Sequence, residues 1–264
     1  MPNPLSFRHL ALLLLGFFAL MLALVWPAPL AFTATSAGSK WMHVAYALTE
    51  SGGKYGTAAI IVLTSLFYSL RFERKRDKTL NFFKSLIALG AFLGIFAFAN
   101  EHLIKKAARI PRPSHLYIFE QAKATMPVDS LYRFESAERH KLLRGLIETQ
   151  AAVFAQVDEK VLSHWIEEDG YSFPSGHSFN AFLLASVLCF SLQRSRTRLA
   201  NYFYLLPPAW AVSVAVSRVA IGAHSALDVS FGALMGVLVA LGFLYFDNTR
   251  RLILQKQHHE RSEA

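Results

Sequence analysis

The stretch PSGHSFNAFLLASVLCFSL, residues 174–192, joins a short polar motif directly to a long apolar segment. A proline and a glycine flank a serine at its start, and His177 follows at once. From residue 179 onward most side chains are apolar, which is typical of a helix that crosses a membrane or lies inside a helical bundle. The stretch therefore predicts a helix with a chemically useful residue at the end where it begins.

Five further apolar segments occur along the chain. Of its 264 residues, 53% are hydrophobic and only 17% are charged, whereas a soluble domain usually has about 25% charged residues. A helix needs roughly 20 mostly apolar residues to cross a bilayer. We therefore expect an all-α integral membrane protein with six transmembrane helices. Their approximate positions are residues 10–32, 57–70, 82–103, 179–192, 199–216 and 227–246.

The first apolar segment has a second interpretation. Arg8 and His9 precede it, and a positive start followed by an apolar stretch is also typical of a secretory signal peptide. The segment is longer than the apolar region of most signal peptides. We therefore predict a span that remains in the chain.

Basic residues gather in three segments and explain most of the net charge of +9. With six spans, all three segments fall on the same side of the membrane, and basic loops generally remain cytoplasmic. The pattern predicts that both termini are cytoplasmic, and it removes the main support for a nucleic-acid partner. The three segments are residues 71–78, 194–198 and 250–261.

One long segment, about residues 104–172, separates the third and fourth predicted spans. It contains helix-like stretches at residues 136–153 and 157–166. Loops of this length without structure of their own are uncommon and are often functional. We expect a small helical cap outside the membrane, within a single domain that covers residues 1–264.

Three polar motifs adjoin the predicted spans, and in the six-span arrangement all three emerge on the outer face. They read KKAARIPRP at residues 105–113, PSGH at residues 174–177 and SRVAIGAHSALD at residues 217–228. Their shared side follows from the predicted topology. The sequence therefore predicts that the three motifs form one site at the membrane surface.

The first motif supplies fixed positive charge through Lys105 and Arg112. An arginine can hold a phosphate group through two parallel hydrogen bonds. Pro111 and Pro113 stiffen the turn that presents Arg112. A basic cluster that only touches lipid headgroups is the alternative for this motif.

The second motif predicts an anion site at the start of a helix. The backbone N–H groups of Ser175 and Gly176 would point toward the anion, and the Ser175 hydroxyl would add one donor. The alternative is an ordinary helix cap formed by Ser175. That alternative does not explain why His177 follows immediately.

The third motif places His224 and Asp228 four residues apart, on one face if the segment is helical. A carboxylate that holds one imidazole nitrogen leaves the other nitrogen free to attack. Arg218 comes six residues earlier and adds a cation. The alternative is an interfacial histidine paired with a nearby acid, although ionisable groups beside a span are often functional.

Together the three motifs resemble the three-part signature of the type 2 phosphatidic acid phosphatase superfamily. The cap sequences MPVDSLY and HWIEEDGYSFPSGHS resemble the bacterial phosphatidylglycerophosphatase B group within it. The resemblance implies an enzyme of a bacterial inner membrane with a periplasmic active site. It implies a lipid phosphate substrate, such as phosphatidylglycerophosphate, phosphatidate, lysophosphatidate, diacylglycerol pyrophosphate or undecaprenyl diphosphate.

The resemblance also implies a role for each residue. His224 would be the nucleophile that forms a phosphohistidine, and Asp228 would orient it. His177 would protonate the leaving lipid alkoxide and then activate water. The phosphoryl oxygens would be held by Lys105, Arg112, Ser175, Gly176 and Arg218.

Several alternatives remain at the sequence level. Two histidines and an acid can bind a metal, but the cations beside them argue against it, so we expect no metal or cofactor. Glu168 is a candidate contact for the substrate headgroup, or else a solvated loop charge. A lipid phosphotransferase of the same family or an anion transporter are the rival functions. No obligate protein partner is evident.

Overall fold

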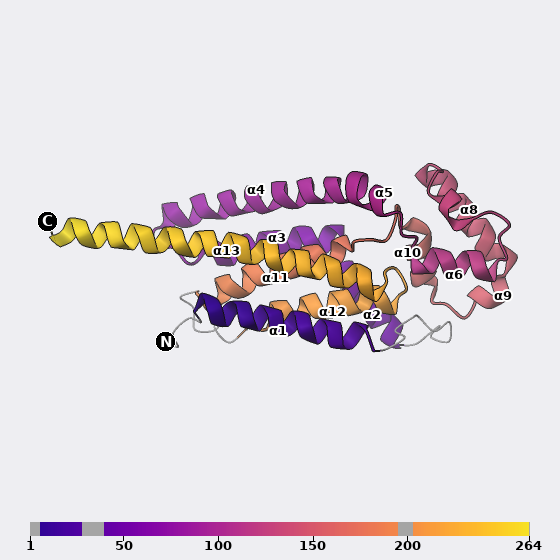
Figure 1. Cartoon of the computed structure of the whole chain (residues 1–264), viewed down its shortest axis with the longest axis horizontal. Helices are drawn as coiled ribbons and strands as arrows, with labels where there is room; N and C mark the ends of the chain where they lie inside the picture. The colour runs from indigo at the N-terminus through magenta and orange to yellow at the C-terminus, as the bar shows by residue number, and fades with distance from the viewer. Residues whose placement is uncertain (1–5, 28–39, 195–202, 264) are drawn as a thin grey trace.

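The computed structural model describes residues 6–27, 40–194 and 203–263, and this part of the chain contains helices and no strands. Six long helices run alternately up and down along one axis (Figure 1). They are α1 (Phe7–Val25), α3 (Lys54–Ser69), α4 (Lys75–Ala99), α11 (Gly176–Gln193), α12 (Leu206–Ala220) and α13 (Ala226–Glu263).

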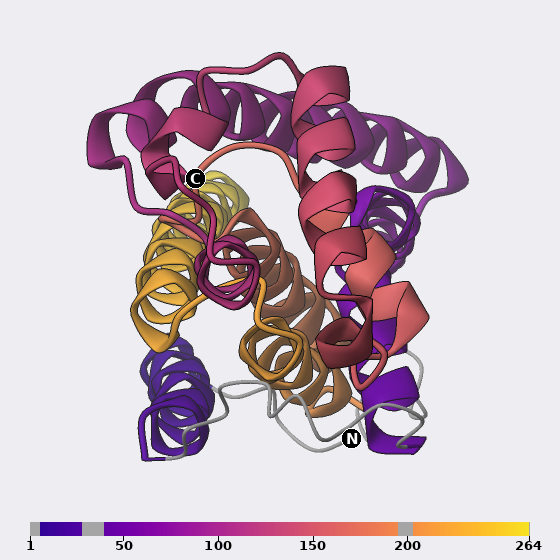
Figure 2. The ribbon, with the colours of Figure 1, turned by 90° about the vertical axis from the view of Figure 1, so that its right-hand side faces the viewer.

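A cap of short helices covers one end of this bundle, and Figure 2 looks onto that end. The cap packs against α2 and against the turn between α12 and α13 through a shared apolar core. At its centre lies the fully buried Trp165, whose ring N–H donates a 2.6 Å hydrogen bond to the Ile221 carbonyl. The cap helices are α6 (Pro113–Gln121), α7 (Val128–Leu131), α8 (Ser136–Thr149), α9 (Ala151–Phe154) and α10 (Glu159–Glu167). Helix α2 (Lys40–Ser51) packs on α12 of the bundle.

Helix α11 lies in the middle of the bundle, packed against α13, α12 and α3. Every residue from Ser178 to Gln193 except Asn180 is buried. Helix α13 approaches it closely through two glycines. A Cβ atom at Gly232 would lie 2.3 Å from the Ser175 carbonyl oxygen, and one at Gly236 would lie 2.5 Å from that of Phe179. Small residues four apart allow this close contact between helices, as they do in membrane proteins.

Within the described ranges, three helical segments are long and apolar enough to cross a membrane: α1, residues 75–108, and residues 226–247 of α13. Helix α4 packs mainly against α3, and its apolar side chains are largely exposed, with Ile95 at 70%. Exposed apolar surface of this kind fits contact with lipid. The arrangement with six spans remains a prediction.

Two predicted spans differ from the observed helices, and proline explains both differences. Helix α1 ends at Val25 with Trp26 as its C-cap, because Pro27 has no N–H with which to continue the helical hydrogen bonds. Residues 28–32 of the predicted span lie outside the described residues. Helix α12 begins at Leu206, with two prolines in its first turn. Proline is tolerated there because that turn has no N–H partner to lose, so the predicted start at residue 199 is wrong for residues 203–205.

Two other elements were not predicted. Helix α2 has a mixed polar and apolar sequence that gave no clear signal. A π-helical turn, η2 (Asn100–Ile104), joins α4 to α5 (Lys105–Ala108) without a break. Wide turns of this type often occur at functional sites. This turn brings Asn100 and Lys105 to the same cavity.

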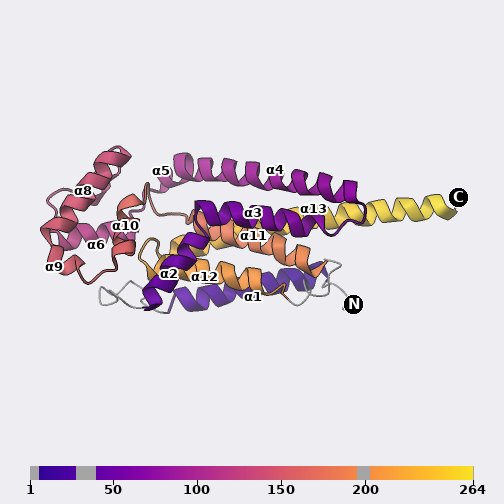
Figure 3. The same cartoon turned by 180° about the vertical axis from the view of Figure 1, so that it is seen from behind.

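The α3–α4 turn, the end of α11 and the end of α13 all lie at the end of the bundle opposite the cap (Figures 1 and 3). The basic segment of residues 71–78 and Arg194 are therefore at that end, as is the last turn of α13. Arg196 and Arg198 lie outside the described residues. The helix directions agree with the prediction that the basic segments lie on the same side of the membrane.

Candidate active site

A cavity of about 780 Å³ lies where the cap meets α3, α4 and α11. Charged and imidazole side chains from all three motifs and the cap line one part of it, among them Lys105, Arg112, Glu168, His177 and His224. The remainder runs between α3 and α4, where the walls are apolar or glycine. The residues that line this apolar arm include Ala58, Ile61, Gly90, Leu93, Gly94 and Ala97.

His224 lies in the turn between α12 and α13. Its Nδ1 atom is 3.6 Å from Asp228 Oδ2, an ion-pair distance slightly longer than a hydrogen bond. Asp228 is fixed in turn, because Oδ2 accepts a 2.7 Å hydrogen bond from the Ser225 N–H while Ser225 Oγ accepts one from the Asp228 N–H. This reciprocal pair is a capping box at the start of α13. The sequence thus places a buried carboxylate behind the imidazole.

The environment of His224 favours its neutral form. Burial lowers the pKa of His224 to about 3, the nearby Asp228 only partly offsets this effect, and Arg218 and Arg112 add to it. Arg112 Nη1 lies 3.5 Å from His224 Nε2, on the side away from Asp228. A neutral imidazole with one nitrogen facing a carboxylate and the other facing a cavity has the properties of a nucleophile.

His177 reaches the same cavity from the first turn of α11. The loop before α3 comes close to it, since a Cβ atom at Gly53 would lie 3.6 Å from His177 Nε2. His177 and His224 therefore face one cavity from different elements. With this arrangement, one histidine can act as a nucleophile while the other transfers protons.

Ser175 lies at the start of a helix as predicted, but it forms the helix cap that was the alternative to an anion site. Its Oγ accepts a 3.4 Å hydrogen bond from the Ser178 N–H as the cap of α11, and its own N–H donates a 3.0 Å bond to the Asp228 carbonyl. Ser175 is fully buried and does not line the cavity, whereas Gly176 does. In this geometry the Ser175 N–H is not available to an anion, because it ties the second motif to the third.

Arg112 is 1% exposed and is held by backbone carbonyl groups. Its Nε donates to the Gly170 carbonyl at 3.0 Å, its Nη2 to that of Asp169 at 2.9 Å, and its Nη1 to that of Ala223 at 3.3 Å. These bonds fix the plane of the guanidinium group beside His224. A group held this rigidly can orient an anion at little entropic cost.

The backbone of the first motif is also tied to the cap. The Arg112 N–H donates a 2.9 Å hydrogen bond to the Tyr132 hydroxyl oxygen. That hydroxyl lies 2.9 Å from His115 Nδ1, and His115 Nε2 lies 3.1 Å from the Trp165 carbonyl oxygen. Because the carbonyl can only accept, the His115 proton is on Nε2 and the tyrosine donates to Nδ1. The cap therefore helps to position Arg112.

Glu168 joins the two arginines. One carboxylate oxygen lies 2.9 Å from Arg112 Nη2, and the other is paired with Arg218 Nη2 and lies 3.0 Å from His164 Nε2. Burial alone would raise the pKa of Glu168, but Arg112, Arg218 and His164 together hold it well below its usual value. Arg218 is fully buried behind this carboxylate and does not line the cavity. Two guanidinium groups thus converge on one anion.

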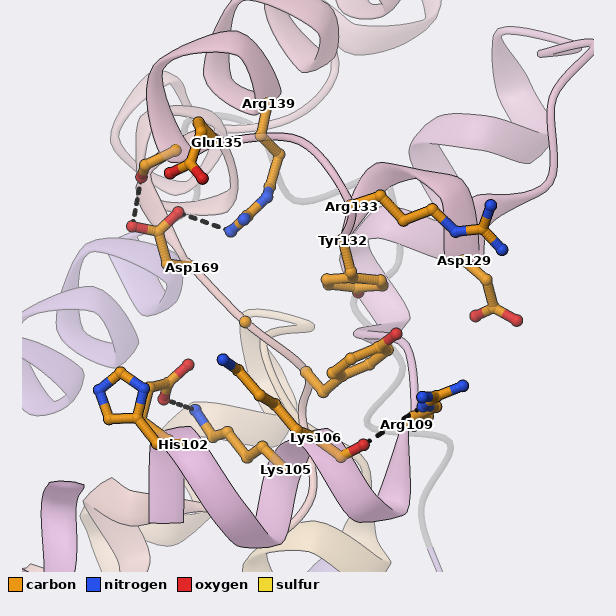
Figure 4. A pocket seen from close by; sticks show the side chains of 14 residues that line it. His102, Lys105, Lys106, Arg109, Asp129, Tyr132, Arg133, Glu135, Arg139 and Asp169 are labelled. Atoms are coloured by element: carbon orange, nitrogen blue, oxygen red, sulfur yellow. Dashed lines mark hydrogen bonds and ion pairs between the residues drawn. The ribbon is translucent and has the colours of Figure 1, made fainter. Parts of the chain in front are cut away.

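Lys105 stands between this cavity and a second one of about 630 Å³ on the cap side. Its Nζ is 2.7 Å from Glu101 Oε2. Figure 4 shows the second cavity, with Lys105 at the bottom, Tyr132 at the right and the ion pair of Arg139 with Asp169 at the upper left. The Arg139 Nη1 to Asp169 Oδ1 distance is 2.7 Å. This polar cavity adjoins the active-site cavity, because Glu101, Lys105 and Asp169 line both.

Comparison with known families decides the classification. A model of the PAP2 superfamily matches residues 85–252, which is more than half of the chain and includes all three motifs. The chain belongs to the PAP2 superfamily. It is therefore a phosphatase.

Curated relatives of this PAP2 protein are also phosphatases by name. Phosphatidylglycerophosphatase B of Haemophilus influenzae is 26% identical over 196 residues, which cover 74% of this chain and 77% of the relative. Phosphatidylglycerophosphatase B of Escherichia coli (strain K12) is 32% identical over 139 residues, 52% of this chain and 51% of the relative. A probable lipid phosphate phosphatase beta of Arabidopsis thaliana is 30% identical over 109 residues, 33% of this chain and 51% of the relative.

The PAP2 site does not fit a metal ion well. Within the described ranges, no three His, Cys, Asp or Glu side chains gather closely enough to hold one together. The Arg112 guanidinium lies 3.5 Å from His224 Nε2, where it would repel a cation. The basic side chains that would repel a metal ion can instead bind phosphate oxygens.

Sequence reasoning missed two residues of this site. His164 bonds both Arg218 and Glu168, and the four-residue spacing of His164 and Glu168 on a predicted helix was a usable signal. Asn100 lines the cavity from the π-helical turn. Its position could not be predicted, because a helix of ordinary pitch would have rotated it relative to Lys105.

Proposed function

We propose that this protein is a membrane lipid phosphate phosphatase that works through a phosphohistidine at His224. The observation that carries the proposal is the composition of the cavity. Its polar part gathers cations around a neutral histidine, and its apolar arm extends between α3 and α4. A molecule that fits both parts has a phosphate group at one end and hydrocarbon at the other.

The polar part of the cavity contains the groups that each step of the proposed reaction needs. His224 Nε2 attacks phosphorus, the bond from phosphorus to the lipid oxygen breaks, and His177 gives a proton to that oxygen. Water then attacks the phosphohistidine while His177 takes its proton, which releases inorganic phosphate. Phosphoryl transfer depends mainly on positioning and charge neutralisation. Lys105, Arg112 and the Gly176 N–H would supply these, since all three residues line the cavity. Arg218 acts on the site through Glu168.

The apolar arm supports a lipid substrate. Gly90 and Gly94 line it on α4, and a Cβ atom at either position would meet nothing within 4 Å. The exposed apolar face of α4 continues this wall outward. Lipid tails would therefore enter sideways from the bilayer while the phosphate reaches His224. Candidate substrates are phosphatidylglycerophosphate, phosphatidate, lysophosphatidate, diacylglycerol pyrophosphate and undecaprenyl diphosphate.

We place the protein in a bacterial inner membrane with six spans, cytoplasmic termini and a periplasmic cap and active site. The direction of the six helices and the basic residues at the end opposite the cap support this orientation.

The direct test is phosphate release from a panel of lipid phosphates by the purified full-length protein. We expect His224→Ala to lower kcat by about a thousandfold or more, since removal of a nucleophile typically has this effect. Denaturing quench with labelled substrate should trap acid-labile phosphate on the wild-type protein and none on the variant. Activity should also resist chelators. Unchanged activity in His224→Ala, or transfer of phosphate to a second lipid in place of release, would contradict the proposal.

A further inference from the structure

Two asparagine side chains lie in the active-site cavity with unpaired carboxamide oxygens. Asn100 Oδ1 and Asn180 Oδ1 are buried and accept no hydrogen bond. Both residues line the cavity, from the π-helical turn and from α11 respectively. A buried acceptor without a partner destabilises a fold unless something else donates to it. The two amides therefore point to a ligand that carries hydrogen-bond donors.

The orientation of Asn100 follows from its surroundings. Its side chain is enclosed, with the residue 4% exposed. Its Nδ2 donates to the Pro174 carbonyl at 3.5 Å, and a carbonyl can only accept, so the oxygen is directed away from that contact. The same amide nitrogen lies against the start of α11, 3.5 Å from where a Cβ atom at Gly176 would be. Asn100 thus stands beside the phosphate end of the cavity.

Asn180 occupies the neighbouring position on α11. It is the one residue between Ser178 and Gln193 that is not buried by the bundle, because it faces the cavity. It comes three residues after His177, which is a rise of roughly 4.5 Å along an α-helix. Asn180 therefore lies about one helical turn further along α11 than the start of the helix, where Asn100 makes its contacts.

We propose that Asn100 and Asn180 form a hydroxyl-recognition subsite for the lipid backbone next to the phosphate. A free hydroxyl on the glycerol unit, a few bonds from phosphorus, would donate to one or both carboxamide oxygens after these turn toward it, because neither oxygen is exposed to the cavity. This inference rests on the proposed lipid phosphatase function and adds a substrate preference to it. Lipid phosphates with a hydroxyl beside the phosphate are preferred over those without one, such as polyprenyl phosphates.

The test uses two substrates that differ by one hydroxyl: 1-oleoyl-glycerol 3-phosphate, with its free C2 hydroxyl, and the C2-deoxy analogue. Both are presented at the same mole fraction in detergent micelles, and kcat/KM is measured for each. We expect the wild-type protein to prefer the hydroxyl substrate by about tenfold, as for one well-formed hydrogen bond in a buried site. In Asn180→Leu the ratio should fall to about 2 or less, while the rate on the deoxy substrate is kept or raised.

Asn100→Leu should reduce the same ratio, although it also removes the contact to the Pro174 carbonyl. The ratio within each protein separates recognition from structural damage, because a misfolded site slows both substrates equally. Ser186→Ala is the matched control on α11, since its hydroxyl bonds only the Phe182 carbonyl within its own helix at 2.7 Å. Its ratio should equal that of the wild type.

Two results would overturn the inference in different ways. If the wild-type protein hydrolyses both lipids equally well, or if both asparagine variants keep the wild-type ratio, the subsite is wrong and the phosphatase function stands. If the wild-type protein hydrolyses neither lipid, nor any other lipid phosphate, the proposed function fails and the subsite fails with it.

Discussion

Glu168 supplies the anion that lies between two buried guanidinium groups. The carboxylate bridges Arg112 and Arg218, and His164 completes its contacts. Removing one partner from a buried ion pair leaves a charge without compensation, which is strongly destabilising. Glu168 therefore acts as a positioning residue that holds the arginines in place.

We expect Glu168→Gln to lower the free energy of unfolding by about 3–5 kcal/mol, the usual effect of breaking a buried pair. Inorganic phosphate should then stabilise the variant more than it stabilises the wild type, because it restores an anion between the arginines. Thermal unfolding with and without phosphate measures both effects. Glu167→Gln is the matched control at an exposed neighbouring position. An equal phosphate effect in both variants would contradict the prediction.

His115 makes the cap sensitive to acid. Burial lowers the pKa of His115 to about 3, with Arg112 adding to the effect. The unfolded chain therefore binds a proton that the folded chain does not between pH 6.5 and about 3, so stability falls as the pH falls through this range. Protonation would also remove the acceptor for the Tyr132 hydroxyl.

At pH 5 the loss from His115 should be on the order of 2 kcal/mol, which is 1.5 pKa units at 1.36 kcal/mol each. We expect His115→Gln to be less stable than the wild type at pH 7 but to lose less on going to pH 5. His224 should keep part of the dependence, because its pKa is lowered in the same way. His9→Gln, at an exposed position, is the control. Parallel pH profiles for wild type and His115→Gln would refute this account.

The site residues differ in how far sequence could predict them. Lys105, Arg112, His177 and His224 follow from motifs with fixed spacing, and the structure brings all four to one cavity. The carboxylate clamp was only partly predictable. Glu168 was a weak candidate and its partner His164 was not assigned, because their importance depends on where the cap folds back onto α12.

At the level of single elements, the contact between α11 and α13 aligns the second and third motifs. Gly232 and Gly236 let the two helices approach so closely that a Cβ atom at either position would clash with the facing backbone. The same contact allows the Ser175 N–H to reach the Asp228 carbonyl at 3.0 Å. Packing at these glycines therefore sets the distance between His177 and His224.

We expect Gly232→Ala to destabilise the protein by about 1–3 kcal/mol, the usual effect of overpacking, and to reduce kcat more than tenfold by separating the two histidines. Gly242→Ala is the control on the same helix, because a Cβ atom there meets nothing within 4 Å. It should be neutral or slightly stabilising, since alanine favours a helix more than glycine does. Thermal unfolding and phosphate release give the comparison. Equal behaviour of the two variants would exclude the proposed alignment.

The predicted spans agree best with the structure where an apolar run lies inside one continuous helix. Residues 227–246 fall inside α13 and residues 179–192 inside α11. Helix α11 carries more polar residues than a lipid-facing helix would, because it is buried inside the bundle along most of its length. Helix α2 and the π-helical turn depend on tertiary packing and left no pattern in the sequence.

At the scale of the whole molecule, the charge distribution and the fold support the same orientation across the membrane. Basic segments and the cap lie at opposite ends of the bundle. The orientation can be tested with single cysteines, because the native Cys189 is buried and should react slowly.

We expect Ser163→Cys, exposed in the cap, to react with a membrane-impermeant maleimide on intact spheroplasts. Thr79→Cys, exposed near the start of α4 at the opposite end, should react only after lysis. The two positions form a matched pair, since neither substitution changes a basic residue. The reverse pattern would invert the orientation, and labelling of both before lysis would contradict a membrane-spanning bundle.

The sideways opening of the apolar arm between α3 and α4 has a kinetic consequence under the proposed function. A substrate that never leaves the bilayer is encountered by diffusion in two dimensions. The reaction rate would then follow the surface fraction of lipid phosphate around the protein, and not its amount per volume of solution. Inert phospholipid added to the same membrane would slow turnover, whereas additional empty vesicles would leave it unchanged.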